Sequence, residues 1–173
     1  NLIGDHQIYN VSTSIAASRK IFNISDANIK NSMSKMILKG RLEEIKSGKL
    51  KNLIGENRLI IDGGHNINSA ISISNWVKQQ NEKVHLICGM MNDKPHKEFV
   101  NQFENSVNSI TLIDIPNQEG SISKEEFKKK LGNKNIHTAE SIEESLLMNN
   151  KDENCIFLCA GSLYLAGEVL NLN

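Results

Sequence analysis

The stretch LIIDGGHNINSA, residues 59–70, contains the transition on which the fold prediction rests. Three apolar residues run directly into the pentapeptide DGGHN (62–66), and a helical pattern of apolar residues then begins. A buried strand followed at once by a helix is typical of a parallel sheet covered by helices. The five residues in between fill a core poorly, so we expect them to serve the turn itself or a ligand bound there.

From residue 40 onward, short apolar runs alternate with amphipathic segments. Near-continuous apolar strands separated by helices predict an α/β fold, a Rossmann-like, mostly parallel sheet with helices on both faces. The segment 40–54 could add an edge strand or hairpin. The expected strands are 58–63, 83–90, 109–115, a short one near 136 and 155–161, and the expected helices are 67–80, 95–104, 123–131, 141–149 and 162–171.

The first forty residues have a helical pattern instead, with helices expected at 10–22 and 25–36. Ser25 and Asp26 are candidates for capping the second helix. The change of pattern places a domain boundary near residues 37–40. We expect the apolar faces of these helices to pack against the α/β domain or to pair with another copy of the chain, with Ile15, Ile21, Met33 and Met36 in the contact.

Composition restricts the possible partners. The chain has 173 residues, 39% of them hydrophobic, and a formal net charge of zero, so no overall field attracts it to nucleic acid or to a membrane surface. No apolar run approaches the ~20 residues that a membrane helix needs. Cys88, Cys155 and Cys159 lie in apolar runs without metal-site spacing, which favours reduced core thiols and a cytoplasmic location. The chain starts without Met, as a truncated piece of a longer protein would.

Each residue of the DGGHN turn has a possible binding role. Asp62 could accept the two hydroxyls of a ribose, and Gly63 and Gly64 allow positive φ and close approach of the backbone to a ligand. Asn66 is placed to cap the following helix. We expect Asp62 and His65 to lie on an exposed loop at the strand end. The alternative is an ordinary tight turn in which Asp62 accepts hydrogen bonds from local amides.

A metal site is a competing interpretation. Asp62 and His65 are three residues apart, and Asp93 and His96 follow a neighbouring strand, so that two carboxylates and two imidazoles could build a hydrolytic centre. The spacing matches no standard metal motif. The chain also contains neither G-x-x-x-x-G-K-[ST] nor G-x-G-x-x-G, so it has no triphosphate-binding loop of its own.

Three more positions could contact a ligand. Asn10, in GDHQIYN (4–10), could hydrogen-bond a base edge with its amide or cap the first helix. Arg41 is one of only three arginines, and its planar guanidinium suits a purine face or a phosphate. Ser162 opens the last helix after a strand end.

Taken together and in order, these segments resemble the folylpolyglutamate synthase/dihydrofolate synthase family, which belongs to the Mur-ligase-like ATP-dependent amide ligases. The resemblance covers essentially the whole chain. The first segment is similar to the family's Gly-x-His-Gln-x-x-Asn and the third to its Asp-Gly-Ala-His-Asn. The segments are GDHQIYN (4–10), GRLEEI (40–45), IIDGGHN (60–66), CGMMNDK (88–94) and GSLYLAGEV (161–169).

The chain departs from the family pattern at several points. Gly64 stands where Ala is usual, which we expect to be harmless; Ile67 replaces a common Pro; and Pro95 replaces a second acidic residue. The resemblance implies that residues 1–38 are the last helices of a truncated central ATPase domain. Residues 39–173 would then be the complete C-terminal domain.

The resemblance also implies a reaction. ATP phosphorylates a carboxylate of dihydropteroate or a folate, and L-glutamate attacks the acyl phosphate to form an amide. Magnesium would be held by the part of the ATPase domain that precedes this chain, and we expect no metal site in the chain itself. The implied roles are adenine contacts for Asn10 and Arg41, the ribose contact for Asp62, closure against the nucleotide for Gly63 and Gly64, catalysis near the glutamate for His65, and substrate binding for Ser162.

Further expectations concern assembly. The full-length enzyme would be a monomer that binds small molecules only, whereas the fragment alone would be inactive and would self-associate through its first two helices. The alternative function is a stand-alone, non-catalytic nucleotide-binding α/β module.

Overall fold

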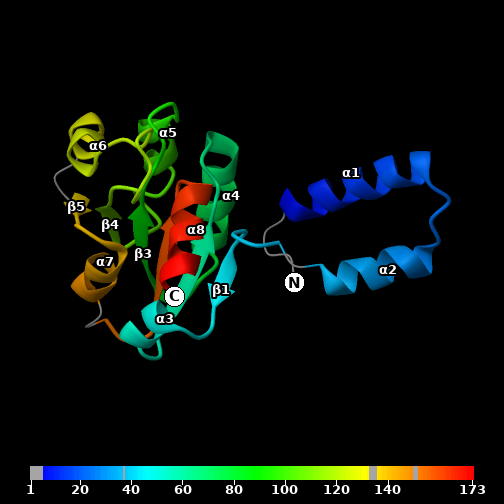
Figure 1. Cartoon of the computed structure of the whole chain (residues 1–173), viewed down its shortest axis with the longest axis horizontal. Helices are drawn as coiled ribbons and strands as arrows, with labels where there is room; N and C mark the ends of the chain where they lie inside the picture. Colours follow the sequence, from blue (N-terminus) through cyan, green and yellow to red (C-terminus); the bar gives the residue numbers. More distant parts are fainter. Residues whose placement is uncertain (1–5, 37, 133–135, 150–151) are drawn as a thin grey trace.

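The computed structural model describes residues 6–36, 38–132, 136–149 and 152–173. Two parts are visible in Figure 1: a layered α/β body, and a pair of helices that extends away from it. We call the pair (residues 6–36) the helical arm and residues 40–173 the α/β body. No helix in the described residues is long and apolar enough to span a bilayer.

One six-stranded sheet forms the centre of the body, in the order β1-β2-β6-β3-β4-β5. The edge strand β1 runs antiparallel to β2, and every other pair is parallel. The expected mostly parallel sheet is therefore confirmed. The strands are β1 (Glu43–Ile45), β2 (Arg58–Asp62), β3 (Lys83–Cys88), β4 (Ser109–Leu112), β5 (Ile136–Thr138) and β6 (Cys155–Ala160).

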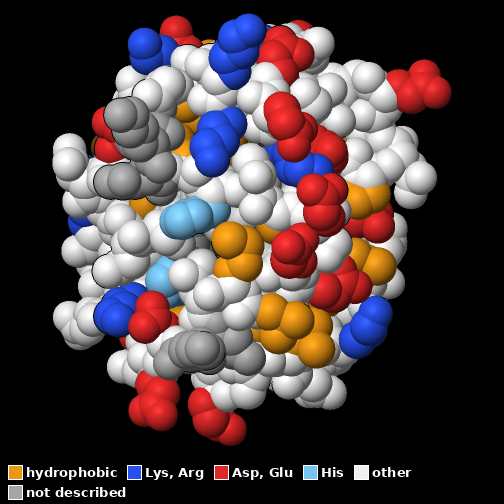
Figure 2. All heavy atoms as spheres, turned by 90° about the vertical axis from the view of Figure 1, so that its left-hand side faces the viewer, with side chains coloured by type: hydrophobic (Ala, Val, Ile, Leu, Met, Phe, Trp, Pro, Cys, Tyr) orange, Lys and Arg blue, Asp and Glu red, His pale blue; other side chains and the backbone are white. Residues whose placement is uncertain are grey.

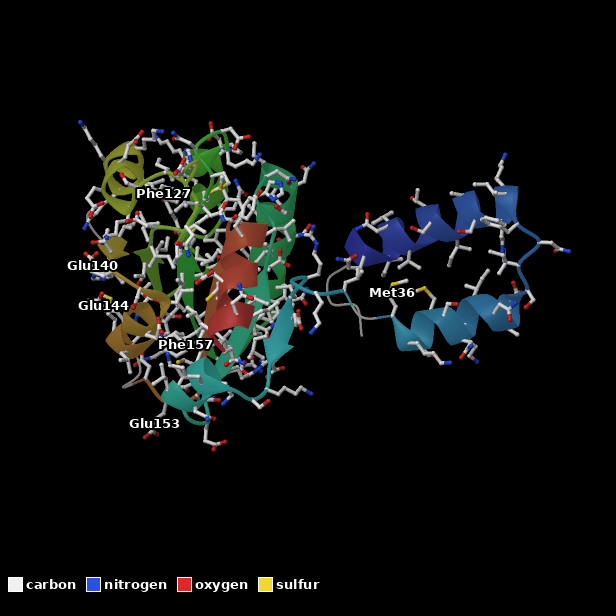
Figure 3. The ribbon with its side chains drawn as sticks, in the orientation of Figure 1. Met36, Phe127, Glu140, Glu144, Glu153 and Phe157 are labelled. Atoms are coloured by element: carbon white, nitrogen blue, oxygen red, sulfur yellow. The ribbon has the colours of Figure 1, made fainter. Side chains whose placement is uncertain are left out.

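Helices cover both faces of the sheet, as expected. Alternate residues of β6 point to opposite sides: Leu158 joins a core with α4, α5 and α6, while Phe157 joins a second core with α3, α7 and α8. Figure 3 shows Phe127 and Phe157 directed into the body. The covering helices are α3 (Lys49–Leu53), α4 (Ile67–Val77), α5 (His96–Asn101), α6 (Lys124–Leu131), α7 (Ile142–Met148) and α8 (Leu163–Leu172).

The main difference from the expected elements lies between β1 and β2. Residues 40–54 do supply the edge strand, but residues 49–53 form the short helix α3 instead of a second strand. The last residue of the chain caps this helix: the Lys49 N–H donates to the Asn173 carbonyl at 2.9 Å, and the Lys51 N–H donates to Asn173 Oδ1 at 3.1 Å. The carboxyl end of the chain therefore completes the β1 edge of the body.

The arm consists of α1 (His6–Ile21) and α2 (Asp26–Lys35). Ser25 caps α2 as expected, with its hydroxyl accepting from the Asn28 N–H at 3.2 Å. Apolar residues of the two helices line a shared groove, and Met36 points into it in Figure 3. The arm does not fold back onto the sheet (Figure 1), so the expected packing of Ile21 against the body is not seen, and Ile21 is 73% exposed.

The face of the body farthest from the arm is strongly acidic. Figure 2 shows Asp and Glu side chains in a band across it, with smaller groups of basic and hydrophobic side chains. Glu140 and Glu144, labelled in Figure 3, lie on this side of the molecule, at and just before α7. Negative charge thus gathers at the β5 edge, away from the β2 strand end.

Candidate functional site

A cavity of about 440 Å³ lies where the arm meets the body, at the carboxyl end of β2. It brings together five of the seven residues for which the sequence predicted a binding or catalytic role: Asn10, Arg41, Asp62, Gly64 and His65. Asn10 comes from α1 and Arg41 from the connection that precedes β1. Asp62 ends β2, and Gly64 and His65 lie in the turn that follows it. The position agrees with the rule that open α/β sheets bind ligands beyond the carboxyl ends of their strands.

Asp62 is the structural centre of the turn. Its carboxylate accepts the Leu42 N–H at Oδ2 (2.9 Å) and the Gly64 N–H at Oδ1 (2.7 Å). Arg41 Nη1 lies 3.8 Å from Oδ1 and supplies the nearest positive charge. The expectation of an exposed position is wrong for Asp62, which is 3% exposed. Buried carboxylates need such partners. Only the Gly64 amide is local to the turn, as the alternative expected; the Leu42 amide comes from the segment before β1.

The segment before β1 wraps around this carboxylate. Gly40 has φ of +62°, and Leu42 has φ of 44° although it carries a side chain. Such a conformation is costly for leucine and persists only where the surroundings hold it. Here the Leu42 N–H donates to Asp62, the Gly40 carbonyl accepts the Gly63 N–H at 2.8 Å, and the Leu42 side chain is buried. These contacts hold Arg41 at the mouth of the cavity.

The two glycines of the turn act differently from expectation. Neither has a positive φ, so that part of the prediction is wrong. Gly63 has no room for a side chain, because a Cβ there would lie 2.2 Å from Leu163 Cδ2 at the start of α8. At Gly64 a Cβ would lie 2.7 Å from Ser69 Cβ. Glycine at 64 is therefore a packing requirement in this chain, and Gly63 serves helix packing and does not line the cavity.

Asn66 caps α4, as expected. Its side chain accepts from the Ser69 N–H at 2.9 Å, and the Ser69 hydroxyl accepts from the Asn66 N–H at 3.1 Å, which makes a capping box. The first turns of α4 also give Asn68, Ser69 and Ser72 to the cavity lining. These residues were missed, although Asn68 and Ser72 are four apart and Ser69 and Ser72 three apart, which puts them on one helical face.

His65 is half-buried, and its ring is held by the backbone. Nδ1 lies 2.9 Å from the Gly63 carbonyl oxygen. Asn10, by contrast, lies in the second turn of α1, so it does not cap that helix; its side chain donates to Gln7 Oε1 at 3.3 Å. Gln7, also on α1, adds another side-chain amide to the cavity lining, and the sequence prediction missed it.

Ser162 is placed differently from the other candidates. It is 2% exposed and caps α8, where its hydroxyl accepts from the Tyr164 N–H at 3.1 Å. Among the described residues it is not part of the cavity lining. The loops after β2 and β6 do meet, since the Gly161 N–H donates to the Gly64 carbonyl at 3.1 Å. The predicted contact of Ser162 with a substrate remains a prediction.

The four residues of the metal interpretation do not form a centre. His96 is buried beside Phe127, and its Nε2 donates to the Met91 carbonyl at 3.0 Å. Residues 6–36, 38–132, 136–149 and 152–173 contain no group of three His, Cys, Asp or Glu side chains that could hold a metal ion. The structure thus uses His96 in the core, and a hydrolytic metal site has no support.

Comparison with solved structures gives strong matches in fold. The chain is similar to folylpolyglutamate synthase of Mycobacterium tuberculosis complexed with ADP and AMPPCP (TM-score 0.85, 16% identity), covering 99% of this chain and 40% of that one. It is also similar to E. coli FolC in complex with ADP (TM-score 0.74, 21% identity, 94% and 38% covered). Folylpolyglutamate synthase of Thermotoga maritima is similar as well (TM-score 0.72, 20% identity), and the match covers 98% of this chain and 39% of that one.

This chain therefore spans about 40% of the length of these structures. No match was found among curated proteins. The model of the family described as Mur ligase, glutamate ligase domain, matches residues 40–163, which include the β2 turn and nearly all of the α/β body. The chain belongs to the Mur ligase family and carries its glutamate ligase domain.

Proposed function

We propose that this chain is the C-terminal part of an ATP-dependent amide ligase that joins L-glutamate to dihydropteroate, to a folylpolyglutamate, or to both. In this proposal residues 1–38 end the ATPase domain and residues 39–173 form the C-terminal domain. One observation carries it: the cavity at the β2 strand end combines Asn10 from α1 with Arg41, Asp62 and His65 from the body. Support also comes from the solved complexes of E. coli FolC with ADP and with DHPP and ADP.

The cavity suits an adenosine nucleotide. The side-chain amide of Asn10 can form hydrogen bonds with the edge of a base, and the Arg41 guanidinium can stack on a purine or bind a phosphate. Asp62 lines the same cavity, where its carboxylate, a hydrogen-bond acceptor, is placed to receive a ribose hydroxyl. His65 would stand beside the glutamate and the acyl phosphate. Catalysis would then rest mainly on positioning and on electrostatic stabilisation of phosphoryl transfer.

Magnesium needs other residues. The described part of the chain offers no group of three metal-binding side chains, and the sequence has no phosphate-binding loop. We therefore assign the magnesium ligands to the part of the ligase that precedes this chain. We also propose a cytoplasmic, monomeric ligase that acts on small molecules alone; the three unpaired, buried cysteines are compatible with a reducing compartment.

The test compares the complete ligase with the chain 1–173 alone. Glutamate-dependent phosphate release is measured with dihydropteroate and, separately, with tetrahydrofolate. We expect activity with at least one pterin substrate in the complete protein and none in the chain alone. Activity of the chain alone would refute the proposed division into domains. Binding of ADP without activity on either substrate would instead favour a non-catalytic nucleotide-binding module.

Variants of the complete ligase test the cavity directly. Asn10→Ala and Arg41→Ala should each raise the KM for ATP, on the order of tenfold, because a hydrogen bond to a charged or polar ligand group is lost. Asn31→Ala is the matched control, since Asn31 lies on an exposed part of α2 outside the cavity lining. An unchanged KM for ATP in both cavity variants would reject the nucleotide site.

A further inference from the structure

Glu43, the first residue of β1, reaches back to the segment that carries Arg41. Its Oε2 accepts the Gly40 N–H at 2.7 Å, and its Oε1 accepts from Lys39 Nζ at 3.1 Å. A glutamate that accepts a backbone N–H three residues earlier is familiar from helix starts, where it satisfies the amide of the capping residue. Here the same reach fixes the entry of the chain into a strand.

The two contacts of this carboxylate differ in weight. The Lys39 side chain is 72% exposed, so its ion pair with Glu43 is screened by water and contributes little. The Glu43 side chain is only 17% exposed, and Gly40 is buried. A buried N–H needs an acceptor, and a carboxylate is a stronger one than a neutral group. The bond to Gly40 is therefore the one that fixes the local geometry.

The segment needs such a bond, because Arg41 lies between two residues with left-handed backbone conformations. Gly40 has φ of +62° and Leu42 has φ of 44°, and the second value is unfavourable for a leucine. The Leu42 N–H is held by Asp62, at the end of β2, and the Gly40 N–H is held by Glu43. The backbone of Arg41 is thus fixed from both sides.

The sheet sets the position of Glu43 in turn. It is paired with Ile61 of β2, the residue before Asp62, so the two carboxylates are carried by neighbouring strands in a fixed register. Arg41 Nη1 lies 3.8 Å from Asp62 Oδ1, which is too long for a hydrogen bond that would orient the guanidinium. The place of the guanidinium therefore depends on how firmly its backbone is held.

We propose that Glu43 is a positioning residue for nucleotide binding: through the Gly40 N–H it holds Arg41 at the mouth of the cavity, where the guanidinium meets the nucleotide. The inference rests on the proposed function and adds to it a residue that does not line the cavity in the described part of the chain. The role requires the length of the glutamate side chain and one acceptor oxygen. It does not require the negative charge.

The first test measures the Kd for ADP of the complete ligase by isothermal titration calorimetry. Glu43→Asp keeps the charge but is one methylene too short to reach the Gly40 N–H, so ADP should bind about three- to tenfold more weakly. Glu43→Gln keeps the reach and one acceptor oxygen, and its Kd should stay within about twofold of the parent value. Glu44→Ala is the matched control on the same strand, because Glu44 pairs with Arg58 instead, and its Kd should not change.

Weaker binding by Glu43→Gln than by Glu43→Asp would assign an electrostatic role to the carboxylate and overturn the inference. A double-mutant cycle then shows whether Glu43 acts through Arg41. Once Arg41→Ala has weakened ADP binding, the addition of Glu43→Asp should cost less than about twofold more. A merely structural role of Glu43 would not give this coupling, and a full additional loss would overturn the inference.

Failure of the inference can be told from failure of the proposed function. If Arg41→Ala weakens ADP binding and Glu43→Asp does not, the inference falls and the nucleotide site stands. If both variants bind ADP like the parent, the nucleotide role of Arg41 falls as well. Glutamate-dependent phosphate release with the two pterin substrates tests the ligase function separately.

Discussion

The α/β body and the helical arm differ in how far their apolar side chains are buried. The body closes two hydrophobic cores, one on each side of the sheet, in which Leu146 and Phe157 are fully buried. In the arm, α2 buries none of its residues, and Ile21 and Phe22 next to it are 73% and 63% exposed. The difference indicates that the body contributes most of the stability of the chain, whereas the arm leaves apolar surface exposed. The candidate site lies where the two meet.

The largest expected effect separates the two regions directly. Leu146→Ala, on α7, removes a fully buried side chain and should lower the free energy of unfolding by about 2–5 kcal/mol. Met33→Ala, on α2, is the matched substitution in the arm, where Met33 is only half-buried, and should cost less than about 1 kcal/mol. Urea unfolding followed by circular dichroism measures both. Equal losses would show that the arm is part of the same core.

The second prediction concerns the boundary itself. Asp62→Ala should lower the free energy of unfolding by about 2–4 kcal/mol, because the Leu42 and Gly64 N–H groups lose a buried, charged acceptor. Asp62→Asn should cost less, since one acceptor oxygen remains. The control is Asp93→Ala on an exposed loop, expected within about 0.5 kcal/mol of the parent. If Asp62→Ala unfolds like the parent, the carboxylate does not stabilise the turn.

The body was more predictable from sequence than the arm. Continuous apolar strands such as CIFLCA (155–160) have no polar face, and only a sheet covered on both sides can bury them. The segment 49–53 was harder, because a five-residue helix leaves too short a periodic pattern, and its cap comes from Asn173 at the other end of the chain. Nothing in the pattern of α1 indicated that it would extend away from the sheet.

The candidate site was predictable as a set of residues but not in its geometry. Motif order placed Asn10, Arg41 and Asp62 together, and one cavity does unite them. The burial of Asp62 could not be inferred, because it depends on the positive φ of Leu42, a conformation that no local signal marks in a leucine. Glycine is needed at position 63 because of the contact with Leu163, which lies a hundred residues further along the chain and could not be foreseen from the local sequence.

Acidification should weaken the body through His85, which is buried on β3. Burial is the main cause that lowers its pKa below the ordinary 6.5, and the Asp152 carboxylate, 3.0 Å from Nε2, only partly opposes it, while Lys83 adds to the lowering. The unfolded chain therefore binds a proton more readily, so the stability that His85 contributes is complete above pH 6.5 and is lost as the pH falls below 6.5 and through the lowered pKa of the folded state.

Unfolding between pH 7.5 and 5.5 can be followed by the fluorescence of Trp76, the single tryptophan, which lies on α4 in the body. His85→Gln should flatten the pH dependence over this interval, because the titrating group is removed. His137→Gln should leave it unchanged, since His137 is exposed. A slope that persists in His85→Gln would assign the pH dependence to another group.

The smallest effect on stability, and the sharpest on assembly, is expected at the end of α1. Phe22→Ser should change the free energy of unfolding by no more than about 0.5 kcal/mol, because the side chain is 63% exposed.

We expect the chain 1–173 to self-associate through the arm, since exposed aromatic and aliphatic side chains grouped on one element favour contact with a second copy. Phe22→Ser should then lower the association constant. Leu147→Ser, at a residue of α7 that is 52% exposed, removes a comparable apolar group from the body and should not. Sedimentation equilibrium over a range of concentrations measures both variants. A parent chain that stays monomeric throughout, or equal losses in the two variants, would show that the exposed surface of the arm does not drive association.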